Sequence, residues 1–189
     1  MDIGESPNNN FSKFYQSGAL SFEIFSNGKK LITNSGYFAN KHNKLNKLSK
    51  STALQSTLSI DDHSSCNYKK LNKSNLVVKK GVRIIKKNVV FEDNYWKISG
   101  SHDGYLKDFK TIHEREIEFY PEQMKFIGFD KLLRKDNSRN TKFDIRFHLD
   151  PSSKVMKTLD NKSILIELGD EGWKFNCENF DINLSLIHI

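Results

Sequence analysis

The sequence predicts an all-β fold, an antiparallel β-sandwich with one solvated face. No segment of the 189 residues has a long apolar repeat of 3.6 residues, whereas many short segments alternate apolar and polar residues. Turn signals separate these segments, such as Asn27-Gly28, Asp103-Gly104 and the glycine-bounded stretch 169–172. We therefore expect one β domain over residues 1–183, without internal repeats.

The first predicted element is a β-hairpin over residues 18–36. Its apolar side chains alternate with polar ones from Leu20 to Ile24. The pair Asn27-Gly28 favours a tight type I′ turn, because both central positions of that turn need a positive φ. Leu31 and Ile32 then open the return strand.

Two strands of the second half carry most of the candidate functional side chains. The predicted strand 111–119 places His113 and Arg115 on one face, and a single strand over 143–149 places Arg146 and His148 on one face. Residues 63–75 read as a polar connection, and another strand begins at 181. If the strands over 111–119 and 143–149 were neighbours, these four side chains would form a basic patch.

Charge, apolar content and cysteine number limit the class of protein to which the chain can belong. The chain is basic, with 30 Lys and Arg against 23 Asp and Glu and a net charge of +7, but its lysines are scattered. No apolar run is long enough for a membrane helix, no signal peptide is visible, and no nucleic-acid-binding motif is present. Cys66 and Cys177 lie far apart and are expected to be unrelated thiols, with a single disulfide as the alternative.

Several ordered motifs carry a resemblance to a known family. They are LSFEIFSNGKKLITNSG (20–36), STALQSTLSIDD (51–62), SHDGYLKDFKTIHEREI (101–117), IRFHLDPS (145–152) and ELGDEGWKF (167–175). Together they resemble the C-terminal β-domain of the heparinase II/III-like family of polysaccharide lyases. The last residues, 184–189, resemble a translated library adapter, so we expect them to be an artefact and the chain to be a gene fragment.

The resemblance implies a parent enzyme with an N-terminal α/α-toroid on which this β-sandwich packs. It implies β-eliminative cleavage of an acidic, uronic-acid-containing polysaccharide, in which a base removes the C5 proton and an acid assists the leaving oxygen. It also implies the cell envelope or periplasm. Because no toroid is present, we expect the isolated chain to be inactive.

The family's own site in this domain does not carry over. The two histidines of its H-x-H-A-D pattern fall on Phe14 and Gln16, and the acid that closes the pattern falls on Gly18. The positions of the zinc set fall on Gln16, Asn34 and Gln55, and carboxamides are poor zinc ligands. We therefore expect no zinc and no other cofactor, and the catalytic residues stay unknown.

Side chains that could bind substrate remain. An arginine can hold a uronate carboxylate through two parallel hydrogen bonds, and the opposing interpretation is a solvated face with cross-strand ion pairs. Tyr105 is expected to pack. Five aromatic side chains are expected in the core rather than on a sugar platform: Trp96, Trp173, Phe22, Phe143 and Phe147. The candidates are Gln16, Gln55, His102, Tyr105, His113, Arg115, Arg146 and His148.

The sequence favours the β-domain of a polysaccharide lyase and leaves two alternatives open. One is a non-catalytic carbohydrate-binding or structural β-sandwich with a degenerate site, favoured by the substitutions at the family positions. The other is a basic domain that binds polyanions without preference and loses them steeply with salt.

Overall fold

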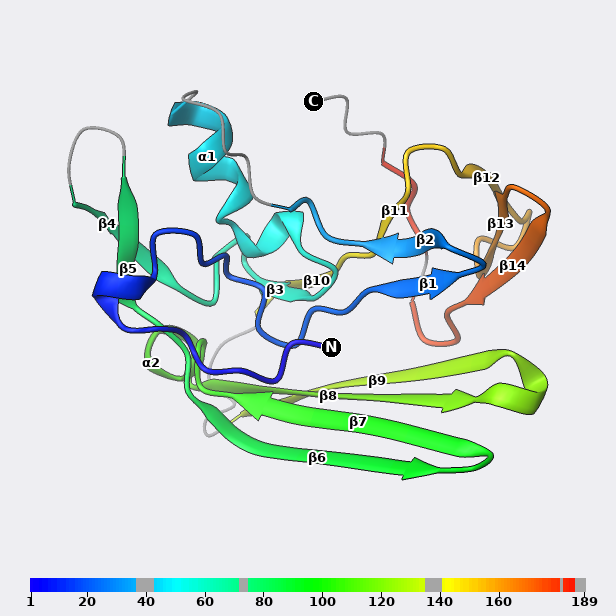
Figure 1. Cartoon of the computed structure of the whole chain (residues 1–189), viewed down its shortest axis with the longest axis horizontal. Coiled ribbons are helices and arrows are strands. Elements are labelled where there is room, and N and C mark those ends of the chain that lie inside the picture. The colour runs from blue at the N-terminus through cyan, green and yellow to red at the C-terminus, as the bar shows by residue number, and fades with distance from the viewer. Residues whose placement is uncertain (37–42, 72–74, 135–140, 181, 186–189) are drawn as a thin grey trace. The chain divides into compact units, whose positions relative to one another are not determined.

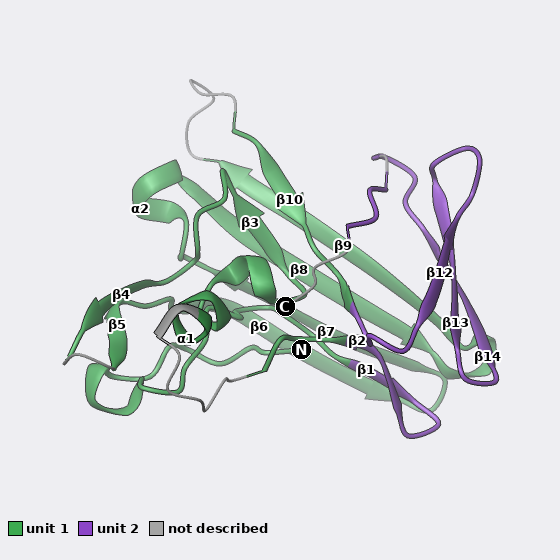
Figure 2. Ribbon diagram, turned by 90° about the horizontal axis from the view of Figure 1, so that it is seen from above, with its two compact units in different colours: residues 1–23, 33–148 green, residues 24–32, 149–189 purple. Residues whose placement is uncertain are grey.

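The structure is a computed structural model that describes residues 1–36, 43–71, 75–134, 141–180 and 182–185. The chain is all-β, as predicted, and the strand pairs whose register is given are antiparallel. It divides into two compact units (Figure 2), residues 1–23 with 33–148 and residues 24–32 with 149–189. The single domain over 1–183 stays a prediction.

The first unit contains a meander of four antiparallel strands (Figure 1). Its strands are β6 (Ile84–Glu92), β7 (Tyr95–His102), β8 (Thr111–Tyr120) and β9 (Lys125–Arg134). The short helix α2 (Leu106–Phe109) joins β7 to β8. Along β8, alternate side chains from Thr111 to Arg115 are buried. One face of this end of the sheet is therefore an interior face.

A small second sheet of the same unit contributes to an apolar cluster. Strand β3 (Leu58–Ile60) pairs with β10 (Phe143–Ile145), and a 3-10 helix (Thr52–Leu54) precedes β3. Leu58, Ile60 and Tyr105 are buried together. The partly buried side chains of Phe109, Leu132, Phe143 and Ile145 pack against them. Since Leu132 belongs to β9, this cluster joins the meander to the second sheet.

The rest of the first unit consists of short elements. A 3-10 helix (Asn9–Phe11), α1 (Asn43–Ser49) and the hairpin of β4 (Asn67–Lys70) with β5 (Leu76–Lys80) belong here. A cluster of Ala19, Cys66 and Val82 is buried. Cys66 and Cys177 are both free thiols.

The second unit is built from antiparallel strands as well. Strand β12 (Lys154–Lys157), which the sequence did not predict, pairs with β13 (Ser163–Leu168), and β13 pairs with β14 (Glu171–Asn176). Strand β1 (Ile24–Ser26) turns into β2 (Lys29–Thr33). Asn27 and Gly28 have φ of 45° and 74°, which confirms the predicted turn with two positive φ angles.

Four sequence predictions need correction. The hairpin's first strand begins only at Ile24, because Leu20 has a φ of 60° and its N–H donates to the Asp2 carbonyl, 2.8 Å away. The strand over 143–149 is divided into β10 and β11 (His148–Leu149), because the Arg146 N–H donates to the Thr57 carbonyl. The polar connection 63–75 contains β4. Asp181 lies outside the described residues, and 182–185 form no strand.

Candidate functional site

A buried ionic cluster occupies the inner face of the meander. Strand register sets Arg115 of β8 opposite Asp130 of β9. Oδ1 of Asp130 accepts hydrogen bonds from His113 Nε2, at 2.6 Å, and Arg115 Nε, at 2.8 Å. Oδ2 accepts from Arg115 Nη2 at 3.0 Å, so the arginine holds the carboxylate through two parallel bonds.

His102 extends this cluster from β7. The backbone N–H of Gly104 donates to its Nδ1, 3.1 Å away, which places the ring proton on Nε2. Nε2 then donates to Nδ1 of His113 at 3.3 Å, and His113 donates to Asp130. The hydrogen bonds thus run in one direction, from Gly104 to Asp130, with both imidazoles neutral.

Burial sets the protonation states of this cluster. Desolvation lowers the pKa of both His102 and His113, because a cation is poorly solvated inside the protein. Burial alone would raise the pKa of Asp130, but the hydrogen bond from His113 and the charge of Arg115 outweigh it and lower that pKa to about 2. At neutral pH the cluster therefore contains one carboxylate, one guanidinium and two neutral rings.

Arg115 also joins separate segments of the first unit. Its Nη1 donates to the carbonyls of Leu20, at 3.1 Å, and Ser56, at 2.8 Å. Its guanidinium lies 5.4 Å from the ring centre of Phe22. Arg115 is 2% exposed, and His102 and His113 are 1% and 0% exposed. These three candidates form an interior cross-link and offer no surface to a polymer.

The motif at 101–105 has an architectural role in the structure. Asp103 accepts hydrogen bonds from the backbone and side chain of Arg83. A Cβ at Gly104 would lie 2.9 Å from the Ser65 carbonyl oxygen, so only glycine fits there. The Tyr105 hydroxyl donates to the Leu58 carbonyl at 3.0 Å, and the side chain is 1% exposed, as the packing interpretation expects.

The positions that correspond to the family's own site lie in a different part of the first unit. Gln16 donates to the Gly36 carbonyl, and Asn34 Oδ1 accepts from the Ser56 N–H at 2.7 Å. Gln55 donates to the Ser49 carbonyl at 3.2 Å and is 2% exposed. Phe14, at 59% exposed, projects from the surface. These side chains supply no group that exchanges a proton near neutral pH.

Lys50 fixes the chain on either side of Phe14. Its ammonium donates to the carbonyls of Lys13 and Tyr15, each at 2.8 Å, and lies 5.0 Å from the ring centre of Tyr68. Lys50 is 2% exposed, and burial lowers its pKa to about 8. Lysine is rarely enclosed in this way, and no motif in the sequence marks this role.

The residues present do not fit a zinc ion. Within the described ranges, no three His, Cys, Asp or Glu side chains come together as metal ligands. At the family positions, the amide nitrogens of Gln16 and Gln55 point to carbonyl oxygens. A neutral amide engaged in this way is a weak ligand. The zinc-free state stays a prediction.

Arg146 and His148 lie apart from His113 and Arg115. Strand β8 has β7 and β9 as its neighbours, whereas Arg146 follows β10, which pairs with β3, and His148 belongs to β11, outside the meander. Strand order therefore does not set the four side chains side by side in one basic patch. Arg146 contacts Asp62 at 3.2 Å and Asp144 at 3.5 Å, with 30% of its side chain exposed. The half-buried His148 contacts the Ala53 carbonyl at 3.0 Å, and desolvation lowers its pKa.

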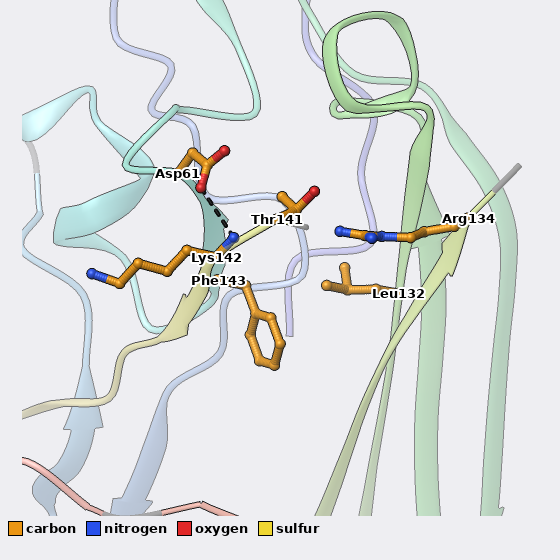
Figure 3. Close-up of a pocket in the computed structure, with 6 residues that line it drawn as sticks. All are labelled: Asp61, Leu132, Arg134, Thr141, Lys142 and Phe143. Carbon is orange, nitrogen blue, oxygen red and sulfur yellow. Dashed lines mark hydrogen bonds between the residues drawn. The ribbon is translucent and has the colours of Figure 1, made fainter. Parts of the chain in front are cut away.

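An open cavity of about 640 Å³ lies between the end of β9 and the start of β10 (Figure 3). Leu132 and Phe143 give it an apolar side, and Arg134 extends toward Thr141. Asp61 also lines it and accepts a hydrogen bond from the Lys142 N–H, 3.1 Å long. Its neighbour Asp62 holds Arg146, so one turn borders both the cavity and Arg146.

Sequence reasoning did not find Asp130. It lies in β9, where the residue opposite Arg115 is known only from strand register, and no spacing along the chain connects the two. The alternation in β8 did place His113 and Arg115 on one face. It did not show that this face is the interior one.

The fold and the site define an all-β domain in which His102, His113 and Arg115 are buried cross-links. A family model, Heparinase II/III-like, C-terminal, matches residues 1–186. The chain therefore belongs to this family, as its motifs predicted. No curated protein and no solved structure matches it. Within the part of the chain that the structure describes, no helix is both long and apolar enough to span a bilayer.

Proposed function

We propose that the chain is the β-domain of a polysaccharide lyase that cleaves a uronic-acid-containing polymer by β-elimination. The observation that carries this proposal is the family match over residues 1–186. The domain packs on a helical toroid of the same protein, in the cell envelope or periplasm. It forms one wall of the substrate cleft, and the toroid supplies the base and the acid.

The positions of the family histidines support this division of labour. Phe14 and Gln16 cannot take up or release a proton at neutral pH. His102 and His113 are enclosed and already hydrogen-bonded, so substrate does not reach them. The contribution of this domain to catalysis is therefore binding and positioning of the polymer.

Arg146 and the cavity beside the Asp61-Asp62 turn are the proposed contacts to the polymer. Arg146 is partly exposed, and its guanidinium suits a carboxylate. In the cavity, Arg134 provides a cation and Phe143 an apolar surface for the sugar ring. The carboxylates of Asp61, Asp62 and Asp144 offset much of this positive charge, so we expect weak binding per sugar.

The test uses the complete gene product and, separately, this chain alone. Each is incubated with a panel of uronate polymers, and ultraviolet absorbance of the unsaturated uronate product is followed. We expect the absorbance to rise with the complete protein and to stay flat with the chain alone. Product from the chain alone, or no product from a folded complete protein with any polymer, contradicts the proposal.

A second candidate is a non-catalytic carbohydrate-binding or structural module. The neutral amides at Gln16, Asn34 and Gln55 favour it, because they replace groups that the family uses for a metal and for proton transfer. A complete protein that binds the polymers without releasing product would establish this function instead.

A further inference from the structure

Three carboxamides join three separate segments of the first unit. Gln16 precedes a buried turn, Asn34 follows β2, and Gln55 follows the 3-10 helix before β3. Gln16 and Gln55 both reach the segment 35–36, through the Gly36 carbonyl and the Ser35 hydroxyl. Asn34 reaches back to the N–H of Ser56, the residue after Gln55. Gln16 and Gln55 therefore contact the segment that contains Asn34, and Asn34 contacts the segment that contains Gln55.

The fourth family position lies beside this group. A Cβ placed on Gly18 would lie 3.6 Å from Oε1 of Gln55, so a side chain there would meet Gln55 directly. The four positions that the resemblance assigns to a metal and its acidic neighbour, 16, 18, 34 and 55, thus converge in the fold. Their chemistry does not match, since three are neutral amides and the fourth is glycine, in place of imidazoles and carboxylates.

We propose that Gln16, Asn34 and Gln55 form a metal-free cross-link that takes the structural place of a zinc ion. The amides satisfy the backbone groups of Gly36, Ser49 and Ser56, which a bound metal would not do. The fold is therefore independent of zinc, while the positions remain close enough for a metal site to be rebuilt. This inference starts from the disagreement with the zinc set that the family resemblance implies.

The first test compares thermal unfolding of the chain in a chelator and in equimolar Zn²⁺. We expect the same midpoint in both, and no zinc retained after purification. Gln55→Ala leaves buried partners unsatisfied and should lower the midpoint by roughly 3–8 °C. Gln123→Ala, at an exposed position beyond β8, is the matched control and should leave the midpoint unchanged. A chelator-sensitive wild type, or stoichiometric zinc, would overturn the proposal.

The second test rebuilds the site with Gln16→His, Asn34→Asp and Gln55→His together. We expect zinc binding in competition with a chromophoric chelator, and a higher unfolding midpoint with zinc than without it. The control variant carries Gln16→His and Asn34→Asp, with Gln123→His in place of Gln55→His. Its unfolding midpoint should not change with zinc. A folded triple variant without a zinc response shows that the positions do not converge.

If the triple variant folds neither with zinc nor without it, the single variants Asn34→Ala and Gln55→Ala test the proposed cross-link. Unchanged unfolding midpoints for both would show that these amides do not cross-link the segments. None of these readouts uses lyase activity, so failure of this inference and failure of the proposed function are distinguishable.

Discussion

The amide cluster and the ionic cluster differ in what their side chains can do. The ionic cluster of His102, His113, Arg115 and Asp130 keeps every titratable group that its motifs suggested, yet it is enclosed. The amide cluster lies where the family resemblance locates metal and proton chemistry, yet it holds neutral groups. Likeness to the family at 101–117 is therefore likeness of architecture, and it does not by itself indicate a working site.

Physical cost explains why the two clusters should respond differently to substitution. A buried charge without its partner is far more costly than a buried amide without its partner. The ionic cluster should therefore dominate stability, and the amide cluster should contribute less.

The largest effect is expected from Asp130→Ala. It leaves the Arg115 guanidinium buried without its carboxylate and removes the acceptor of His113. We expect a loss of about 3–5 kcal/mol in the free energy of unfolding, measured by urea denaturation. Glu116→Gln is the control, because Glu116 lies on the other face of β8 in a partly exposed pair with Lys97. The free energy of unfolding of that variant should fall by less than about 1 kcal/mol. Equal losses for the two variants would mean that the buried and exposed faces of β8 do not differ in their contribution to stability.

Acidification should break the ionic cluster in two steps. The folded state keeps His102 and His113 neutral, whereas the unfolded chain takes up protons near pH 6.5, so stability falls as the pH drops below 6.5. The folded pKa of Asp130, about 2, lies below its ordinary 3.8, so a further loss of about 2 kcal/mol follows as the pH falls through that interval.

The measurement is the unfolding free energy in urea at a series of pH values. His102→Gln removes one neutral imidazole and should flatten the upper step. If that variant kept the full slope below pH 6.5, the acid sensitivity would come from other groups.

The same two clusters show how far the sequence could predict the structure. Alternation along 111–119 correctly placed His113 and Arg115 together, because a strand has a period of two. The sequence could not show which face was interior, since that depends on Leu20, Phe22 and Ser56, which approach from distant segments. Whether Arg146 lies beside His113 and Arg115 could not be decided from the sequence, because strand order is not encoded in alternation.

Local turn chemistry was predicted better than strand limits. Asn27-Gly28 needs only its own backbone, so the turn was correct. Leu20 looked like a strand residue from its spacing, but pairing with Asp2 holds it at a positive φ. Lysine is usually solvated, so no pattern in the sequence marks Lys50 as buried, and only the structure shows its two carbonyl partners.

A smaller effect is expected from Lys50, which borders the amide cluster. Its folded pKa of about 8 lies below its ordinary 10.5, so the folded state loses this proton first and stability rises as the pH increases above 8. Urea denaturation at about pH 7.5 and about pH 9.5 should show this rise, and Lys50→Met should lack it. The same rise in Lys50→Met would assign it to another group.

The smallest effect is expected at Arg146, where both clusters are intact and only binding changes. Arg146→Ala should weaken binding of a uronate polymer by the complete protein roughly twofold to fivefold at low salt, because one partly exposed charge is lost. Asp62→Asn should act in the opposite direction, since it releases Arg146 from a competing carboxylate. Lys154→Ala, which removes an exposed partner of Glu167, is the control.

The opposed signs at positions 146 and 62 make this prediction stringent, although each change is small. General loss of positive charge would weaken binding in Lys154→Ala as much as in Arg146→Ala, and Asp62→Asn would then help only as any lost negative charge does. A local site requires Lys154→Ala to have no effect and the gain from Asp62→Asn to disappear when Arg146→Ala is added. Additive effects in that double variant would mean that the two side chains do not act on one bound carboxylate.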